Sequence, residues 1–128
     1  MVVLNPTDHW VEATRTVGHY PDATERSGKW LCFTNEQDAE QMWSLVARAT
    51  RDGLLGSFSD MTPARPGSEA RVIEVHTYDW HDAADVRRVR VELRRIGYVN
   101  PIPYKTDTDT EAGIYKQTGF ERISRYFE

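Results

Sequence analysis

The sequence predicts an α+β domain in which a curved, mainly antiparallel sheet carries two helices packed on one face. Two stretches, around 39–52 and 83–96, have apolar residues at helical spacing, whereas the remaining apolar stretches alternate with a period of two. Most of the alternating stretches are joined by short connections, which favours antiparallel pairing because parallel strands need long crossovers. At 128 residues, the chain has the size of one domain.

The composition is that of a globular protein and narrows the classes of function. A net charge of −4 and a pI near 5.6 argue against nucleic-acid binding driven by bulk charge. The single cysteine, Cys32, leaves no internal disulfide and no Cys/His zinc cluster. Residues 1–10 lack the pattern of a signal peptide, and no stretch has the roughly 18 consecutive apolar residues of a membrane helix. We therefore expect a cytoplasmic protein with no membrane partner.

The first 27 residues form a polar segment with one short strand expected around His9–Thr14, and residues 28–128 form the single α+β domain. Lys29–Thr34 is the first strand predicted in that domain. Its alternation places Leu31 and Phe33 on one face and Trp30 and Cys32 on the other. Both faces of this strand are therefore apolar.

A helix is expected directly after this strand. Thr34 to Gln37 has the sequence of a capping box, in which the Thr34 hydroxyl accepts a hydrogen bond from the amide of Gln37. Gly53 is typical of the residue just past a helix end. The apolar residues at helical spacing between them are Ala39, Met42, Trp43, Val46 and Ala49.

The next elements are a short strand at 56–61, an exposed loop at 62–69 and the strongest predicted strand, at 71–78. On the last of these, Ile73 and Val75 share one face, and Glu74 and His76 share the other. Since the helices should cover the apolar face, we expect the opposite, concave face to carry Glu74, His76 and Trp30.

The second helix is expected from Ala83 to Ile96, with Asp82 as its N-cap and Gly97 just past its end. One side is apolar and an adjacent arc is basic, because five arginines fall there: Arg87, Arg88, Arg90, Arg94 and Arg95. Three further strands are expected in the tail, at 99–105, 113–116 and 122–127.

Several side chains are candidates for a site on the concave face. His76 titrates near neutrality, so it suits an acid or a phosphate contact, although a hydrogen-bonded structural histidine is the alternative. Lys105 and Lys116 would favour an anion, or would protect a sheet edge from aggregation. Trp30 would stack on a ligand or wall the site, and Tyr104 and Tyr115 would frame it.

The segment Thr106–Thr110 has two carboxylates, Asp107 and Asp109, at a spacing that a divalent cation can use. Such Asp- and Thr-rich segments are more often solvated turns, so no metal is expected. No cofactor is expected either, because the sequence lacks Walker A, Rossmann glycine, Gly-x-Ser-x-Gly and His-Glu-x-x-His motifs.

Three segments in this order resemble the basophilic leukaemia-expressed protein family: the strand Val72–Trp80, the Arg-rich helix 82–97, and Tyr104–Lys116 with its Tyr-Lys-x-Asp and Gly-Ile-Tyr-Lys motifs. The resemblance covers about residues 28–117. It implies a fold similar to that of the cap-binding translation initiation factor 4E and a sequence link to phosphothreonine lyases.

The first expectation for function is a site on the concave face for a phosphate-bearing ligand, either a nucleotide or a phosphopeptide. Trp30, His76, Tyr104, Lys105, Tyr115 and Lys116 would line it. The first alternative is a β-eliminating enzyme like the phosphothreonine lyases, with Lys105 or Lys116 as base and His76 as acid. The second is a protein-interaction module that uses the Arg87–Arg95 helix face.

Overall fold

The computed structural model describes residues 11–62, 70–108 and 125–128. Its six strands form one sheet in the order β1-β3-β4-β2-β5-β6, and every neighbouring pair is antiparallel. In chain order the elements are β1 (Val11–Thr14), β2 (Gly28–Asn35), α1 (Ala39–Arg51), β3 (Phe58–Met61), β4 (Ala70–Thr77), α2 (Ala83–Ile96), β5 (Pro103–Thr106) and β6 (Tyr126–Phe127).

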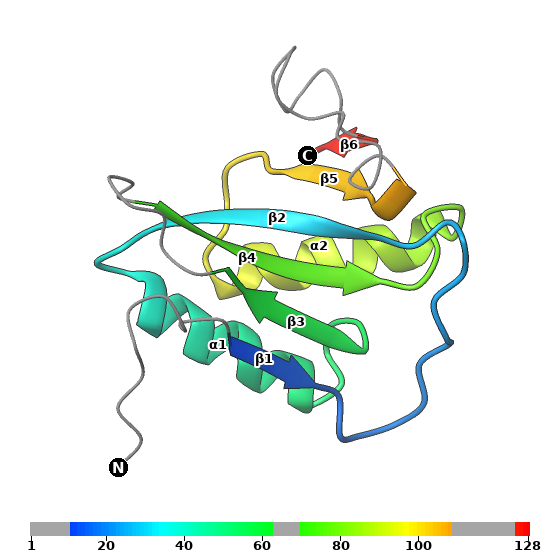
Figure 1. Ribbon diagram of the computed structural model, residues 1–128, viewed down its shortest axis with the longest axis horizontal. Helices are drawn as coiled ribbons and strands as arrows, with labels where there is room; N and C mark the ends of the chain where they lie inside the picture. Colours follow the sequence, from blue (N-terminus) through cyan, green and yellow to red (C-terminus); the bar gives the residue numbers. More distant parts are fainter. Residues whose placement is uncertain (1–10, 63–69, 109–124) are drawn as a thin grey trace.

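Both helices lie on the same side of the twisted, open sheet. Figure 1 looks onto the opposite side, with α2 running behind β4 and β2 and α1 behind β1. The predicted fold class, an antiparallel sheet with two helices on one face, is thus confirmed. We call the side without helices the open face.

The core fills the space between the sheet and the helices. Ile73 and Val75 of β4 are fully buried and belong to one cluster with Val86, Val89 and Leu93 of α2. The intervening β4 residues are only half-buried, so the alternation read from the sequence matches the burial pattern of β4. The helices are held by this burial rather than by their intrinsic propensity.

Residues 11–27 contribute one strand to the sheet and several hydrogen bonds to the helices and the segments next to them. β1 is an edge strand paired with β3, close to the strand predicted at His9–Thr14. Beyond it, the Arg15 guanidinium donates to the carbonyls of Gly53 and Leu55 at 2.9 and 2.8 Å, which ties this segment to the end of α1. The Tyr20 hydroxyl bonds the Asp85 carboxylate of α2.

The helix ends agree with the sequence at three of four positions. Gly53 and Gly97 have positive φ values of 80° and 142°, as expected just past a helix. The Asp82 carboxylate accepts from the amide of Asp85 at 3.1 Å and caps α2. The capping box of Thr34 is wrong, because β2 extends through Asn35.

The Thr34 hydroxyl therefore faces Tyr98, at 2.5 Å from its hydroxyl oxygen, rather than the helix. Asn35 instead stabilises the turn that leads into α1, because its side-chain oxygen accepts a hydrogen bond from the amide of Asp38 at 2.9 Å. β2 continues through Thr34 and Asn35 because the β4 residues opposite them, Arg71 and Ala70, are still part of a strand that pairs with them.

The tail contains two of the predicted strands at shifted positions. β5 occupies the end of the stretch predicted at 99–105, and β6 occupies the end of the stretch predicted at 122–127. The strand predicted at 113–116 lies outside the described residues. No helix within the described ranges has the length and apolar character needed to cross a membrane.

The Arg26–Asp79 ion pair predicts how stability depends on pH. Two guanidinium nitrogens of Arg26 bond the buried Asp79 carboxylate, the shorter contact being 2.7 Å. These bonds, helped by the amide of His81, outweigh burial and lower the pKa of Asp79 from 3.8 to about 2. Ionised Asp79 therefore stabilises the fold above pH 3.8, and this contribution is lost as the pH falls toward 2.

We expect Asp79→Asn to lower the melting temperature at pH 7 and the difference from wild type to vanish between pH 3.8 and 2. Thermal melts across this range measure both quantities. Glu25→Gln is the matched control, because the Glu25 side chain is 88% exposed and lies 3.8 Å from the same arginine. A difference that stays constant down to pH 2 would contradict the assignment.

Candidate functional site

A row of basic side chains crosses three neighbouring strands on the open face. In the β2–β4 pair Lys29 lies opposite His76, and in the β2–β5 pair Lys29 lies opposite Lys105. Directly opposed residues of antiparallel strands project to the same face of the sheet. Two predicted site residues, His76 and Lys105, therefore share a row whose centre is Lys29.

A pair of acidic side chains lies beside this row. Asp60 of β3 is opposite Glu74 of β4. Burial, the neighbouring Asp60 charge and a hydrogen bond with Asp60 raise the pKa of Glu74 to about 6, against the attraction of Lys29. The Asp60 side chain is only 5% exposed, so the two carboxyl groups meet where water screens them little.

The central lysine is held by a third carboxylate. The Lys29 ammonium donates to Asp107 at 2.9 Å and lies 3.9 Å from a Glu74 oxygen. Burial alone would raise the pKa of Asp107, but hydrogen bonds from Ser27 and Lys29 bring it below its ordinary value. Asp107 was considered as a metal ligand together with Asp109, but its carboxylate holds Lys29, and Asp109 lies outside the described residues.

We name these six residues the open-face cluster: Lys29, Asp60, Glu74, His76, Lys105 and Asp107. The first five come from adjacent strands, and Asp107 directly follows β5. Lys29 and Lys105 are 7% and 4% exposed, whereas the side chains of His76 and Asp107 are 25% and 31% exposed. Solvent therefore reaches the cluster mainly at His76 and Asp107.

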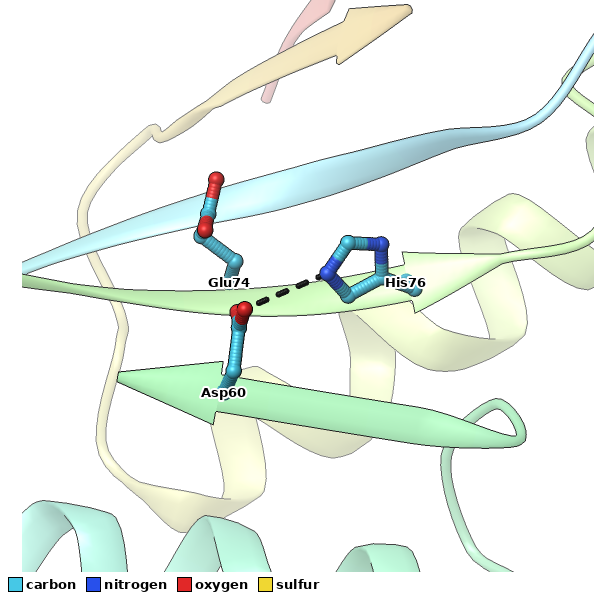
Figure 2. Close-up of side chains that lie close together, drawn as sticks. All are labelled: Asp60, Glu74 and His76. Atoms are coloured by element: carbon cyan, nitrogen blue, oxygen red, sulfur yellow. Dashed lines mark ion pairs between the residues drawn. The ribbon is translucent and has the colours of Figure 1, made fainter. Parts of the chain in front are cut away.

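Within the cluster, Asp60 and His76 have unfulfilled hydrogen-bonding capacity. Asp60 Oδ1 and His76 Nε2 lie 3.5 Å apart, and neither of these buried atoms has a hydrogen-bond partner. One ligand atom from each of Asp60, Glu74 and His76 lies within 4.8 Å of the other two. Figure 2 shows Asp60 on β3 directed toward the pair on β4.

Trp30 and Tyr104 were predicted to line the concave face, and this placement is wrong. Trp30 lies opposite Val75 and Tyr104 opposite Trp30, so both belong to the face that the helices cover. Both residues are fully buried. The Trp30 indole donates to the Val86 carbonyl of α2 at 3.0 Å, and the Tyr104 hydroxyl lies 2.7 Å from the Thr77 hydroxyl. Neither ring is available to a ligand.

Two other predicted site residues, Tyr115 and Lys116, lie outside the described residues. The approach of Lys105 and Lys116 therefore stays a prediction. Lys105 is located, and it lies on the open face in register with His76 through Lys29.

The basic face predicted for Arg87–Arg95 is exposed except at Arg90, and several of its exposed arginines make contacts within the protein. Arg90 is 1% exposed and donates to three backbone carbonyls. Arg88 bonds Asp85 at 2.9 Å and also two carbonyls of the 54–55 segment. Arg95 lies 3.7 Å from Glu92 of the same helix. The helical geometry alone had placed Arg90 on the exposed basic arc, and this placement is wrong.

Sequence reasoning missed Lys29 and Asp60 as members of the site. Lys29 has the parity of Leu31 and Phe33, which were taken as the core-facing side of their strand. Asp60 stands in a predicted strand with no distinctive motif around it. The only available signal was that each is a charged residue inside a strand, where a charge needs a partner.

Comparison with known protein families identifies a relationship. The family model described as basophilic leukemia-expressed protein Bles03 matches residues 12–113. The matched segment runs from β1 past β5 and contains all six residues of the open-face cluster.

Proposed function

The chain belongs to the basophilic leukemia-expressed protein family, and from that premise we propose that its open face binds a phosphate-bearing ligand. The observation that carries the proposal is the row formed by Lys105, Lys29 and His76 on three adjacent strands. Backbones of neighbouring strands are about 4.8 Å apart, so side chains in one row can contact different oxygens of a single phosphate group.

Burial of the two lysines supports this assignment. An ammonium group attracts an anion more strongly where the effective dielectric is low, and Lys29 and Lys105 are both almost fully buried. The Lys29 charge is balanced by nearby carboxylates, chiefly Asp107 at 2.9 Å from the Lys29 nitrogen. A bound phosphate dianion would take over part of the negative charge that these carboxylates now provide to the lysine. It would enter beside His76 and Asp107, the most exposed positions of the cluster.

The ligand is recognised through its phosphate rather than by ring stacking. Trp30 is the residue that the resemblance to the cap-binding fold had suggested for stacking, and Tyr104 was expected to frame the site, but both belong to the core. The row of basic side chains therefore does not favour nucleotides over phosphopeptides, and titration with members of both classes distinguishes them.

The test is a thermal-shift and calorimetric titration with inorganic phosphate, nucleotides, a methylated cap analogue and phosphothreonine peptides. A ligand at 100 times its dissociation constant adds about 2.7 kcal/mol, which moves the melting temperature of a domain this size by several degrees. We expect one phosphorylated class to produce this shift. Lys29→Gln and Lys105→Gln should each weaken binding at least about tenfold, equivalent to about 1.4 kcal/mol.

Arg51→Gln is the matched control, because it also removes one positive charge but from an exposed position at the end of α1. Its ligand-induced shift should equal that of wild type. The proposal fails if no phosphorylated compound shifts the melting temperature, or if Arg51→Gln reduces binding as much as the two lysine variants do.

A second candidate is β-elimination of phosphate from a phosphothreonine side chain. It is favoured by the positions of Lys105 and His76 on opposite sides of Lys29 in one row. A lysine amine would remove the α-proton, the electron pair would form the Cα–Cβ double bond, and the Cβ–O bond would break as protonated His76 donates a proton to the departing phosphate. Mass spectrometry of the phosphopeptide samples distinguishes the two candidates, because elimination produces a dehydrated residue and free phosphate, whereas binding leaves the peptide unchanged.

A further inference from the structure

Three side chains of the open-face cluster have the composition of a metal site. Asp60, Glu74 and His76 each offer a ligand atom, and these atoms all lie within 4.8 Å of one another. They come from the adjacent strands β3 and β4, and Figure 2 shows Asp60 and His76 directed toward each other with Glu74 beside them. Rigid neighbouring strands hold such ligands more precisely than loops do.

Asp60 provides an independent indication that a ligand belongs here. Its side chain is 95% buried, being 5% exposed, and its Oδ1 has no hydrogen-bond partner. The facing Nε2 of His76 also has none. A buried polar atom without a partner is costly, and buried charges in proteins are generally paired or bound to metals.

The separation of these two atoms suits a shared cation better than a hydrogen bond. Oδ1 of Asp60 and Nε2 of His76 are 3.5 Å apart, beyond the usual range for a nitrogen–oxygen hydrogen bond. Two ligand atoms at about 2.1 Å from one ion, at a tetrahedral angle, lie roughly 3.4 Å apart. The third ligand atom, an oxygen of Glu74, lies within 4.8 Å of both.

We propose that Asp60, Glu74 and His76 bind a divalent transition-metal ion, with Zn²⁺ as the best match. An imidazole nitrogen with two carboxylate oxygens favours such ions over Mg²⁺ and Ca²⁺, which prefer oxygen ligands alone. Three protein ligands leave a fourth position open, as in catalytic rather than structural zinc sites. The three ligand side chains project to the same side of the sheet as Lys29 and Lys105.

The nearby lysine does not occupy the place of the ion. Lys29 lies 3.9 Å from a Glu74 oxygen but donates at 2.9 Å to Asp107, which holds its ammonium group on the far side. The metal site does not depend on the two lysines of the phosphate proposal, because none of its three ligand atoms is contributed by a lysine. His76 is shared by the two sites, and with an ion bound its Nε2 would hold the ion rather than the phosphate. An ion here would add positive charge beside the basic row and could also hold an oxygen of the bound phosphate.

The experiment begins with full-length protein treated with a chelator and dialysed into phosphate-free buffer. Titration calorimetry with Zn²⁺, Mn²⁺ and Mg²⁺ then gives stoichiometry and affinity, and thermal melts give the stabilisation. We expect one Zn²⁺ per chain, a rise in melting temperature, and much weaker binding of Mg²⁺. Asp60→Asn and His76→Gln should lower zinc affinity by more than about 100-fold, the upper end of the loss seen when an outer-shell partner is removed.

Asp60→Asn also separates a ligand role from a structural one. Without metal, this variant should change the melting temperature little, because it removes both the repulsion from Glu74 and the contact with His76. The zinc-induced rise should nevertheless disappear. A structural role would instead lower the melting temperature both with and without zinc.

Two controls complete the design. His81→Gln removes an exposed histidine outside the cluster and should bind zinc as wild type does. Lys105→Gln should also retain zinc binding, so that failure of the phosphate proposal and failure of this one are distinguishable. The metal site is ruled out if wild type binds no zinc, or if His76→Gln binds it as tightly as wild type.

Discussion

Replacing Trp30 with alanine is expected to lower the free energy of unfolding by about 3–5 kcal/mol, the range for removing a large buried aromatic side chain. Trp30 is fully buried and meets Tyr104 edge-on with ring centroids 5.2 Å apart. Its indole nitrogen donates to the Val86 carbonyl of α2 at 3.0 Å. The substitution therefore leaves a cavity between sheet and helix and removes the indole's hydrogen bond to this carbonyl. Urea denaturation measures the loss.

Phe33→Ala is the control for Trp30→Ala. Phe33 is an aromatic residue of the same strand, but it projects to the other face and is 43% exposed, so we expect a loss below about 1 kcal/mol. Trp30→Phe keeps most of the volume and removes only the indole donor. If Trp30 served a ligand rather than the core, Trp30→Ala would leave stability almost unchanged, and Trp30→Phe would weaken phosphate binding.

Arg90→Met should lower the free energy of unfolding by a similar amount, about 3–5 kcal/mol, because it removes three hydrogen bonds made by a charged side chain that is 1% exposed. The Arg90 guanidinium donates to the carbonyls of Glu128, Tyr98 and Asn100 at 2.7, 2.8 and 2.7 Å. It thereby joins α2 to the segment after it and to the residue following β6. Methionine preserves the apolar stem and removes all of these donors.

Arg95→Met, five residues along the same helix, provides the comparison. The Arg95 side chain is 75% exposed and lies 3.7 Å from Glu92, so its loss should change stability by less than about 0.5 kcal/mol. Chemical denaturation of both variants gives the difference. Equal effects at the two positions would show that the hydrogen bonds of Arg90 do not stabilise the fold as its contacts indicate.

Local patterns predicted most of the fold. As expected, α2 begins after Asp82 and ends before Gly97, and Gly53 follows the end of α1. Caps and positive-φ glycines could be predicted because they depend only on residues close by in the sequence. The alternation in β4 also assigned Ile73 and Val75 to the core. Thr34 was misassigned because strand pairing with β4 continued past it, and pairing is not a local property.

The site was predicted only in part. His76 was placed correctly on the open face, because its strand has one apolar face and one polar face. Lys105 was also a candidate, but its partner in the row, Lys29, was not. The alternation of Lys29–Thr34 separates its two faces without saying which one meets the helices, since Leu31 and Phe33 are as apolar as Trp30 and Cys32.

The sequence by itself determined the α+β class, the two helices and the faces of β4, because these follow from composition, capping and a one-sided apolar pattern. The family was indicated separately, by the resemblance of its motifs. The tertiary structure alone decided that Trp30 enters the core and that Lys29, Asp60 and His76 meet on the open face. The physical reason is register: a shift of one residue between paired strands turns every side chain to the other face. Only the pairing of Trp30 with Val75 and of Asp60 with Glu74 fixes that choice.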